Sequence, residues 1–399
     1  MFRTVCVGGP FYIITGDKNM NFEKLTEYLD SLPGRGIPSV DCIITKGYER
    51  VYRHMAGTTD KDYSVPVNGN ELYLMFSMTK VITMTALMQL EEMGKLSLED
   101  EVGMYLPAYK DVKVKDIPFG QEESGTHTIK NTLKIWHLVS MQSGLDYNLE
   151  RPGILRVLKE KGQQATTREI AEAFADTPLN FEPGTRYDYS LSHDVVAAII
   201  EVVSGMSFGE YLKKNIFDPL KMTRTRFAKP HNDNVEGLAQ QFIMKEDMSI
   251  VPMEQDCCYQ LSENYESGGA GLLSCTEDYS KFAEAMANGG ISSDGVRIIK
   301  AETIEKMKKN LLCEASHNDI EQKMGRYGYG YGCGMQVLLD PKAVDSPAPK
   351  GIFGWDGAAG SMIFMDTENK ISIVYTMHVR NCGPAYGEIH PTLRDLLYL

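Results

Sequence analysis

Long apolar runs, blocks of like charge and clustered cysteines are all missing from this chain of 399 residues. Without a run of about 18 consecutive apolar residues, the sequence predicts no membrane-spanning helix. With a net charge of −13 and no basic block, it also lacks the positive face on which nucleic acids bind. We therefore expect neither a membrane nor a nucleic acid as a partner.

The eight cysteines are scattered and include no C-x-x-C pair, which argues against a zinc site and against a dense disulfide framework. They are Cys6, Cys42, Cys257, Cys258, Cys275, Cys313, Cys333 and Cys382. Reduced thiols fit a cytoplasmic protein, and the even count leaves disulfides open. The first residues are mildly apolar, but Gly-Gly-Pro interrupts them and no small-residue cleavage site follows. We interpret them as a non-secretory extension, with a short signal peptide as the alternative.

Hydrophobic residues make up 43% of the chain and charged residues 24%, the ordinary composition of a globular protein with a large core. Apolar periodicity and helix stops predict helices over 21–32, 77–93, 131–141, 168–176, 194–204 and 392–398. Alternation and turn residues predict strands over 40–45, 51–55, 361–365 and 371–377, and a β-rich stretch over 329–339. Two strands, a long helical stretch and then more strands indicate one discontinuous α/β lobe with a helical lobe inserted into it. We place 1–76 with 280–399 in the first lobe and 77–279 in the second, with the active site between them.

Ser77 and Lys80 are the most informative pair in the sequence. Three residues apart, they lie on one face of a helix, in a segment so apolar that it reads as buried. Burial disfavours a free ammonium, lowers the pKa of the lysine and leaves an amine that can take the serine proton. The Ser77 backbone N–H, at the start of a helix, is also available to an oxyanion. A helix cap at Ser77 and a surface lysine at Lys80 are the structural alternative.

Further blocks decide between these two interpretations. Phe76-Ser-Met-Thr-Lys80 is followed in order by a block over 89–107 and by four more over 137–145, 183–190, 217–225 and 268–278. Together they resemble the serine β-lactamase and penicillin-binding-protein superfamily, in the branch of class C β-lactamases and family VIII carboxylesterases. The resemblance runs from about residue 40 to the C-terminus. It implies an α/β (α+β) fold with an antiparallel sheet flanked by terminal helices and an inserted helical lobe.

The resemblance also assigns Tyr189 a role, because it stands where the family has the tyrosine of its Tyr-x-Asn motif. A tyrosine oxygen beside the lysine would act as general base or proton relay, whereas a core tyrosine is the structural alternative. The chain has Leu191 where β-lactamases carry an amide, so a polar contact to a β-lactam is missing. At this position the chain resembles the esterase branch.

A third block, Gly354 to Gly360, matches the position where β-lactamases have Lys-Thr-Gly and the esterases often have Trp-Gly-Gly. Trp355 and Asp356 replace the cationic lysine, and Asp356 would repel a substrate carboxylate. Gly357 would let the substrate approach the strand, and the N–H of Ala358 would be the second oxyanion donor. A glycine-rich hairpin leading into a strand is the structural alternative.

Other candidates are weaker. Ser207 fits G-x-S-x-G, the nucleophile elbow of α/β-hydrolases, but the run before it reads as a helix rather than a strand. We expect Gly205 to end that helix and Ser207 to cap the next one. His137 and His193 have no spaced ligand partners and are expected to be structural, although His193 is near enough to Tyr189 to line the site. Loops such as 110–130 and 228–262 are expected to contribute lining residues.

We therefore expect a serine hydrolase that acts on carboxylic esters through an acyl-enzyme, with Ser77, Lys80 and Tyr189 as catalytic residues and with no metal or organic cofactor. The substrate would be a small ester or amide. β-Lactamase or D-amino-acid peptidase activity, acyl transfer to an alcohol, and a non-catalytic binding protein on the same scaffold remain alternatives. The acyl group, the leaving group and the oligomeric state do not follow from the sequence.

Overall fold

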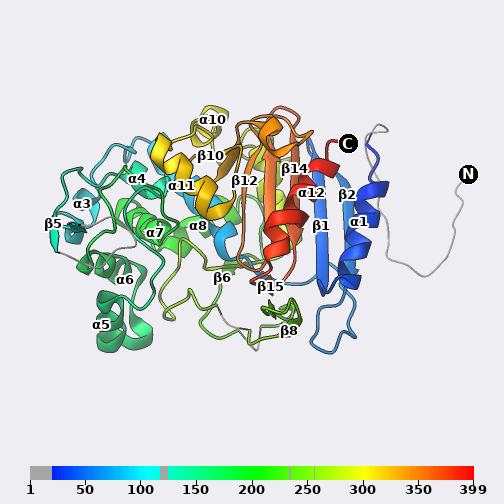
Figure 1. Cartoon of the computed structure of the whole chain (residues 1–399), viewed down its shortest axis with the longest axis horizontal. Helices are drawn as coiled ribbons and strands as arrows, with labels where there is room; N and C mark the ends of the chain where they lie inside the picture. The colour runs from blue at the N-terminus through cyan, green and yellow to red at the C-terminus, as the bar shows by residue number, and fades with distance from the viewer. Residues whose placement is uncertain (1–19, 117–124, 233–234, 256) are drawn as a thin grey trace, which may run out of the picture.

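The computed structural model describes residues 20–116, 125–232, 235–255 and 257–399 (Figure 1). The interpretation of the first residues as a non-secretory extension falls almost wholly on 1–19, outside this range. The division of the chain into two lobes stays a prediction.

Both ends of the chain build one antiparallel sheet of seven strands, in the order β10-β11-β12-β13-β14-β1-β2 (Figure 1). The junction lies between β14 and β1, where Ile43 pairs with Val374. The strands are β1 (Ser39–Lys46), β2 (Glu49–Gly57), β10 (Tyr329–Tyr331), β11 (Gln336–Leu338), β12 (Phe353–Asp356), β13 (Met362–Asp366) and β14 (Ile371–Thr376).

The two faces of the sheet supply separate hydrophobic cores, because successive side chains in a strand point to opposite faces. In β14, Ile373 and Tyr375 join the core beneath the terminal helices α1 (Glu23–Gly34) and α12 (His390–Leu396). Val374, between them, joins the larger core that continues into the helical part of the chain. The near-continuous apolar strands of the sequence are therefore covered on both sides.

Helix α2 (Thr79–Glu92) lies in the middle of that larger core and packs against α7 (Ser192–Ser204). All its residues from Thr79 to Leu90 are buried, as expected for a helix that is apolar on every side. The other α-helices are α3 (Val102–Tyr105), α4 (Ile135–Val139), α5 (Pro152–Lys161), α6 (Thr167–Ala173), α8 (Phe208–Leu212), α9 (Thr276–Ala287), α10 (Ala301–Met307) and α11 (Glu314–Met324). Of these, α9 packs against the central strands of the sheet.

Short strands form three small sheets around this framework. They are β3 (Tyr73–Leu74) with β9 (Leu272–Ser274) and β6 (Arg226–Phe227); β15 (Val379–Arg380) with β7 (Phe242–Met244) and β8 (Ile250–Pro252); and β4 (Lys113–Lys115) with β5 (Thr126–Thr128). The first of these sheets leads directly into the segment that carries Ser77.

The predicted α/β fold, with an antiparallel sheet flanked by terminal helices, is confirmed, and both of these helices cover the same face of the sheet. The β-rich stretch predicted over 329–339 is the hairpin of β10 and β11, whereas β12 was not predicted. Helix α1 also includes Pro33, which stands in its last turn.

Candidate active site

Ser77 lies in a single 3-10 turn, Phe76–Met78, between β3 and α2. The residue before it, Phe76, has a φ of 45°, a left-handed conformation that bulky side chains rarely adopt. Phe76 is completely buried, and its packing holds this strained backbone in place. The turn places Ser77 at the wall of a cavity instead of inside the helix.

Lys80 is fully buried behind Ser77, as expected for a lysine whose amine accepts the proton of the serine. The Nζ atom lies 3.3 Å from Ser77 Oγ and 3.3 Å from the hydroxyl of Tyr147, and it donates to the Gly269 carbonyl at 2.8 Å. Burial lowers the pKa of Lys80 to about 7, against the opposing charges of Asp194 and Asp356. A substantial fraction of Lys80 is therefore the neutral amine at neutral pH.

Tyr189 completes the arrangement from the loop before α7. Its ring lies over Lys80, with Nζ 4.5 Å from the ring centre, and its hydroxyl accepts a hydrogen bond from Trp355 Nε1 at 3.0 Å. Burial raises the pKa of Tyr189, and hydrogen bonds with the Ser77 hydroxyl and the Trp355 indole act in the opposite direction. The structure thus brings the three predicted catalytic residues together.

The third block, from Trp355 to Ala358, covers the end of β12 and the turn that follows it. The Trp355 ring stacks on Tyr189 at 5.7 Å between ring centres. An added Cβ at Gly357 would lie 2.4 Å from the Met75 carbonyl oxygen, so only glycine lets this turn meet the Ser77 segment. Within the described residues, neither the Ser77 N–H nor the Ala358 N–H donates a hydrogen bond, and both residues line the cavity.

Asp356 and Leu191 differ from their sequence-based roles. Asp356 forms a buried ion pair with Arg326, so it does not present the lone negative charge from which repulsion of a carboxylate was expected. Leu191 is 2% exposed and packs in the hydrophobic core at the start of α7 rather than against the cavity. Because position 191 lies in this core, an apolar side chain packs there better than an amide.

The cavity has a volume of about 490 Å³, and aromatic residues are the largest group in its lining, beside three charged ones. Its lining consists of Ser77, Tyr147, Tyr189, Tyr259, Lys323, Met324, Arg326, Trp355, Asp356, Ala358 and Tyr386. Sequence reasoning missed several of these, including Tyr147, although Tyr147 stands only two residues after the block over 137–145 that carries the resemblance. No local signal marks Arg326, which enters the cavity because α11 ends in a left-handed turn at Gly325.

The weaker candidates take structural roles. Ser207 caps α8: its Oγ accepts from the Glu210 N–H, and Glu210 accepts in return from the Ser207 N–H. Burial lowers the pKa of His137 to about 4 and places the pKa of His193 well below its usual range. Neither histidine lines the cavity.

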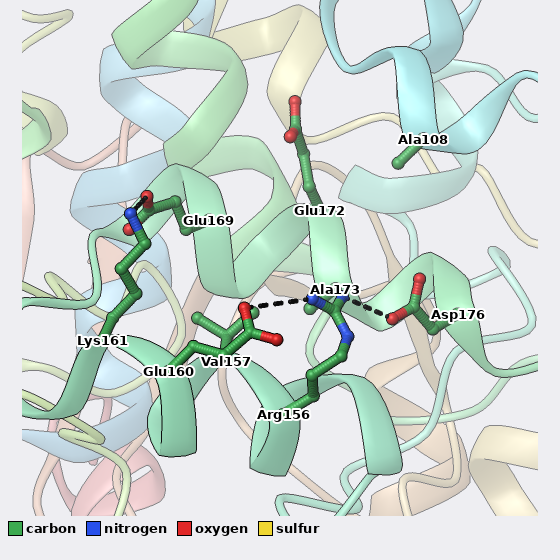
Figure 2. A pocket seen from close by; sticks show the side chains of 9 residues that line it. All are labelled: Ala108, Arg156, Val157, Glu160, Lys161, Glu169, Glu172, Ala173 and Asp176. Atoms are coloured by element: carbon green, nitrogen blue, oxygen red, sulfur yellow. Dashed lines mark hydrogen bonds and ion pairs between the residues drawn. The ribbon is translucent and has the colours of Figure 1, made fainter.

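A second cavity, of about 280 Å³, lies between α5 and α6 and is lined mostly by charged side chains (Figure 2). Arg156 contacts Asp176 at 2.8 Å and Glu160 at 3.6 Å, and Lys161 contacts Glu169 at 3.1 Å. Figure 2 shows these charged side chains directed at one another, with no serine, cysteine or histidine among them. The pair of Lys161 with Glu169 connects α5 to α6, and the pair of Arg156 with Asp176 connects α5 to the 3-10 turn that follows α6.

The part of the chain that the structure describes contains no group of three or more His, Cys, Asp or Glu side chains that could hold a metal ion. Its cysteines, Cys42 through Cys382, are all free. No single described helix is long and apolar enough to cross a membrane, and one bent pair, Ser192–Ser204 with Phe208–Phe217, passes on length and composition alone.

Known proteins resemble this chain, some in sequence and some in structure. A family model described as Beta-lactamase matches residues 22–395. The chain is 26% identical to esterase EstB of Burkholderia gladioli, over 92% of each chain. It is 27% identical to a putative D-alanyl-D-alanine carboxypeptidase of Escherichia coli, over 89% of this chain and 82% of the relative. The solved structure of EstCE1, a hydrolase with promiscuous acyltransferase activity, superposes with a TM-score of 0.76 at 23% identity, covering 94% of this chain and 98% of the other.

Proposed function

The chain belongs to the Beta-lactamase family and is a serine hydrolase of that superfamily, and on this premise we propose that it hydrolyses carboxylic esters through an acyl-enzyme on Ser77. The observation that carries the proposal is the position of Ser77 Oγ, 3.3 Å from the buried amine of Lys80 and beside Tyr189. A neutral amine in hydrogen-bond reach of a hydroxyl is the arrangement that activates a serine nucleophile.

Acylation begins when Lys80 takes the Ser77 proton. Ser77 Oγ then attacks the ester carbonyl, and the N–H groups of Ser77 and Ala358 hold the negative oxygen of the tetrahedral intermediate. Tyr189, whose burial keeps it protonated, donates its proton to the departing alcohol and recovers one from Lys80. Deacylation repeats these steps in reverse, with water in place of the alcohol.

Several residues favour an ester over a β-lactam substrate. The position where the family's β-lactamases carry an amide is the buried Leu191, and the position of their cationic lysine is Trp355, whose indole instead holds Tyr189. The relative EstB is named an esterase, which agrees with this preference. The aromatic lining of the cavity suits an apolar acyl or alcohol group.

The test is hydrolysis of short-chain p-nitrophenyl esters by the wild type, Ser77→Ala and Ser207→Ala. Loss of the nucleophile should lower kcat by on the order of 10⁴–10⁶, while Ser207→Ala should keep the wild-type rate. Rapid quenching of the wild type should also give a protein whose mass is increased by one acyl group. Equal activity of wild type and Ser77→Ala would contradict the proposal.

A further inference from the structure

Arg380 in β15 is a positively charged side chain for which the described residues supply no matching carboxylate. Its Nη1 donates to Cys258 Sγ at 3.6 Å, and the guanidinium lies over the rings of Phe76, at 4.9 Å, and Tyr259, at 5.8 Å. Its Nε is buried and has no hydrogen-bond partner among the described residues, where no ion pair to Arg380 is found either. Because arginine cannot be deprotonated in a protein, this charge persists at every working pH.

Arg380 is not one of the residues that line the cavity, but the fold holds it close to the segments that carry the two predicted oxyanion donors. The residue before it, Val379, donates to the Ala359 carbonyl at 2.9 Å, and Ala359 follows Ala358 in the chain. Phe76, under the guanidinium, precedes Ser77. Tyr259 and Tyr386, which line the cavity, both interact electrostatically with Arg380.

The charge of Arg380, unpaired among the described residues, distinguishes it from Arg326, the cation that lines the cavity beside Asp356. Arg326 is neutralised by Asp356, whereas the rings under Arg380 orient its guanidinium without cancelling its charge. Leaving a half-buried cation without an anion costs stability, so a ligand that supplies the anion is favoured at this point. The net charge of −13 on the whole chain acts weakly there, since exposed charges more than about 8 Å away are screened at physiological salt.

We propose that Arg380 binds a carboxylate of the substrate, so that the esters this protein hydrolyses best are anionic ones. A guanidinium is a planar fork of N–H donors that matches the two oxygens of a carboxylate, and here the group lies over Phe76 and Tyr259 with Nη1 donating to Cys258. This inference rests on the proposed function, since it names the substrate class of the same site.

The experiment compares esters that differ only by a terminal carboxylate. The mono-p-nitrophenyl esters of dicarboxylic acids, from glutaric to suberic, are each paired with the neutral ester of the same chain length. For at least one length, wild type should have the higher kcat/KM on the anionic ester. Arg380→Gln should lower the ratio of anionic to neutral kcat/KM about tenfold or more, and Arg380→Lys should lower it less.

The matched control is Arg156→Gln, which makes the same change in net charge in the cleft between α5 and α6 (Figure 2). It should leave the ratio as in the wild type. Equal ratios in wild type and Arg380→Gln, or an equal fall in Arg156→Gln, would overturn the inference. If Arg380→Gln does not fold, as judged by circular dichroism, the Lys variant decides: an unchanged ratio overturns the inference, and a several-fold fall supports it.

Binding separates this inference from the proposed function. In a Ser77→Ala background, which leaves the ester intact, calorimetry should give tighter binding of the anionic ester than of its neutral partner. Adding Arg380→Gln should remove that difference, and a difference that survives the substitution would overturn the inference. Turnover lost by Ser77→Ala tests the nucleophile alone, so either conclusion can fail while the other stands.

Discussion

Lys80 has no contact with solvent, and this burial sets the pH at which its amine accepts a proton. With a pKa lowered to about 7, the amine is protonated in acid and neutral in mild base. We predict that kcat/KM for a p-nitrophenyl ester rises between pH 6 and 8 and then levels off. Initial rates corrected for spontaneous hydrolysis measure this, and a rise only above pH 9.5, as for an ordinary lysine, would contradict it.

Asp194 provides the control for that profile. It is buried, it accepts from Tyr265 and Ser267, and its charge raises the pKa of Lys80 against the effect of burial. Asp194→Asn should therefore move the midpoint of the pH profile to lower pH. A fall in rate with an unmoved midpoint would mean that Asp194 acts through packing alone.

Residue chemistry was predictable from the sequence where it depends on short spacing, and unpredictable where it depends on distant partners. The pair Ser77 and Lys80 could be inferred because one helical turn separates them. The ion pair of Asp356 with Arg326 joins β12 to the turn after α11. The sequence around either residue contains no signal that predicts the other as its partner. That is why Asp356 was expected to act as a lone anion.

At the scale of the element, Ser207 belongs to a helix cap. Gly205, with a φ of 72°, ends α7, and the reciprocal hydrogen bonds of Ser207 and Glu210 begin α8. Ser207→Ala should lower the free energy of unfolding by about 1 kcal/mol, the usual effect of removing such a cap, and leave kcat unchanged. Urea denaturation and an ester assay test both parts, and loss of activity in the folded variant would restore the nucleophile-elbow interpretation.

A substitution in the turn after β12, in contrast to Ser207→Ala, is expected to lower activity. Since a Cβ at Gly357 would meet the Met75 carbonyl at 2.4 Å, Gly357→Ala must push the turn away from the Ser77 segment. We expect kcat to fall on the order of 10², as when one oxyanion donor is lost, together with a lower melting temperature. Gly383→Ala, where a Cβ has nothing within 4 Å, is the matched control and should behave as wild type.

Elements with strong periodicity were predicted well, and those that depend on tertiary contacts were not. Helix α7 runs from Ser192 to Ser204, close to the predicted 194–204, because its apolar residues and Gly205 mark it locally. Strand β12 has only four residues, two of them Gly354 and Asp356, which are unfavourable in strands. It is held by pairing with β11 and β13, which the local sequence does not encode.

At the scale of the whole molecule, β14 is the strand that joins the two ends of the chain. It pairs with β13 on one side and with β1 on the other. A chain that stops at Lys370 lacks this strand, so we predict that it gives no cooperative urea transition and no ester hydrolysis. Deleting only Leu399, which is 77% exposed, should leave the unfolding midpoint unchanged. A cooperative transition in the shorter chain would show that the sheet closes without β14.

The pairing of β1 with β14 also sets the order of events during synthesis. The hydrogen bond between Thr45 and Ser372 spans 327 residues, so β1 leaves the ribosome roughly 15 seconds to a minute before its partner exists. Throughout that interval the apolar segment around Ser77 has no sheet behind it, and Lys80 is still hydrated. The segment that carries Ser77 and Lys80 therefore stays exposed until β14 has been made, and an exposed lysine keeps the ordinary, high pKa of its side chain.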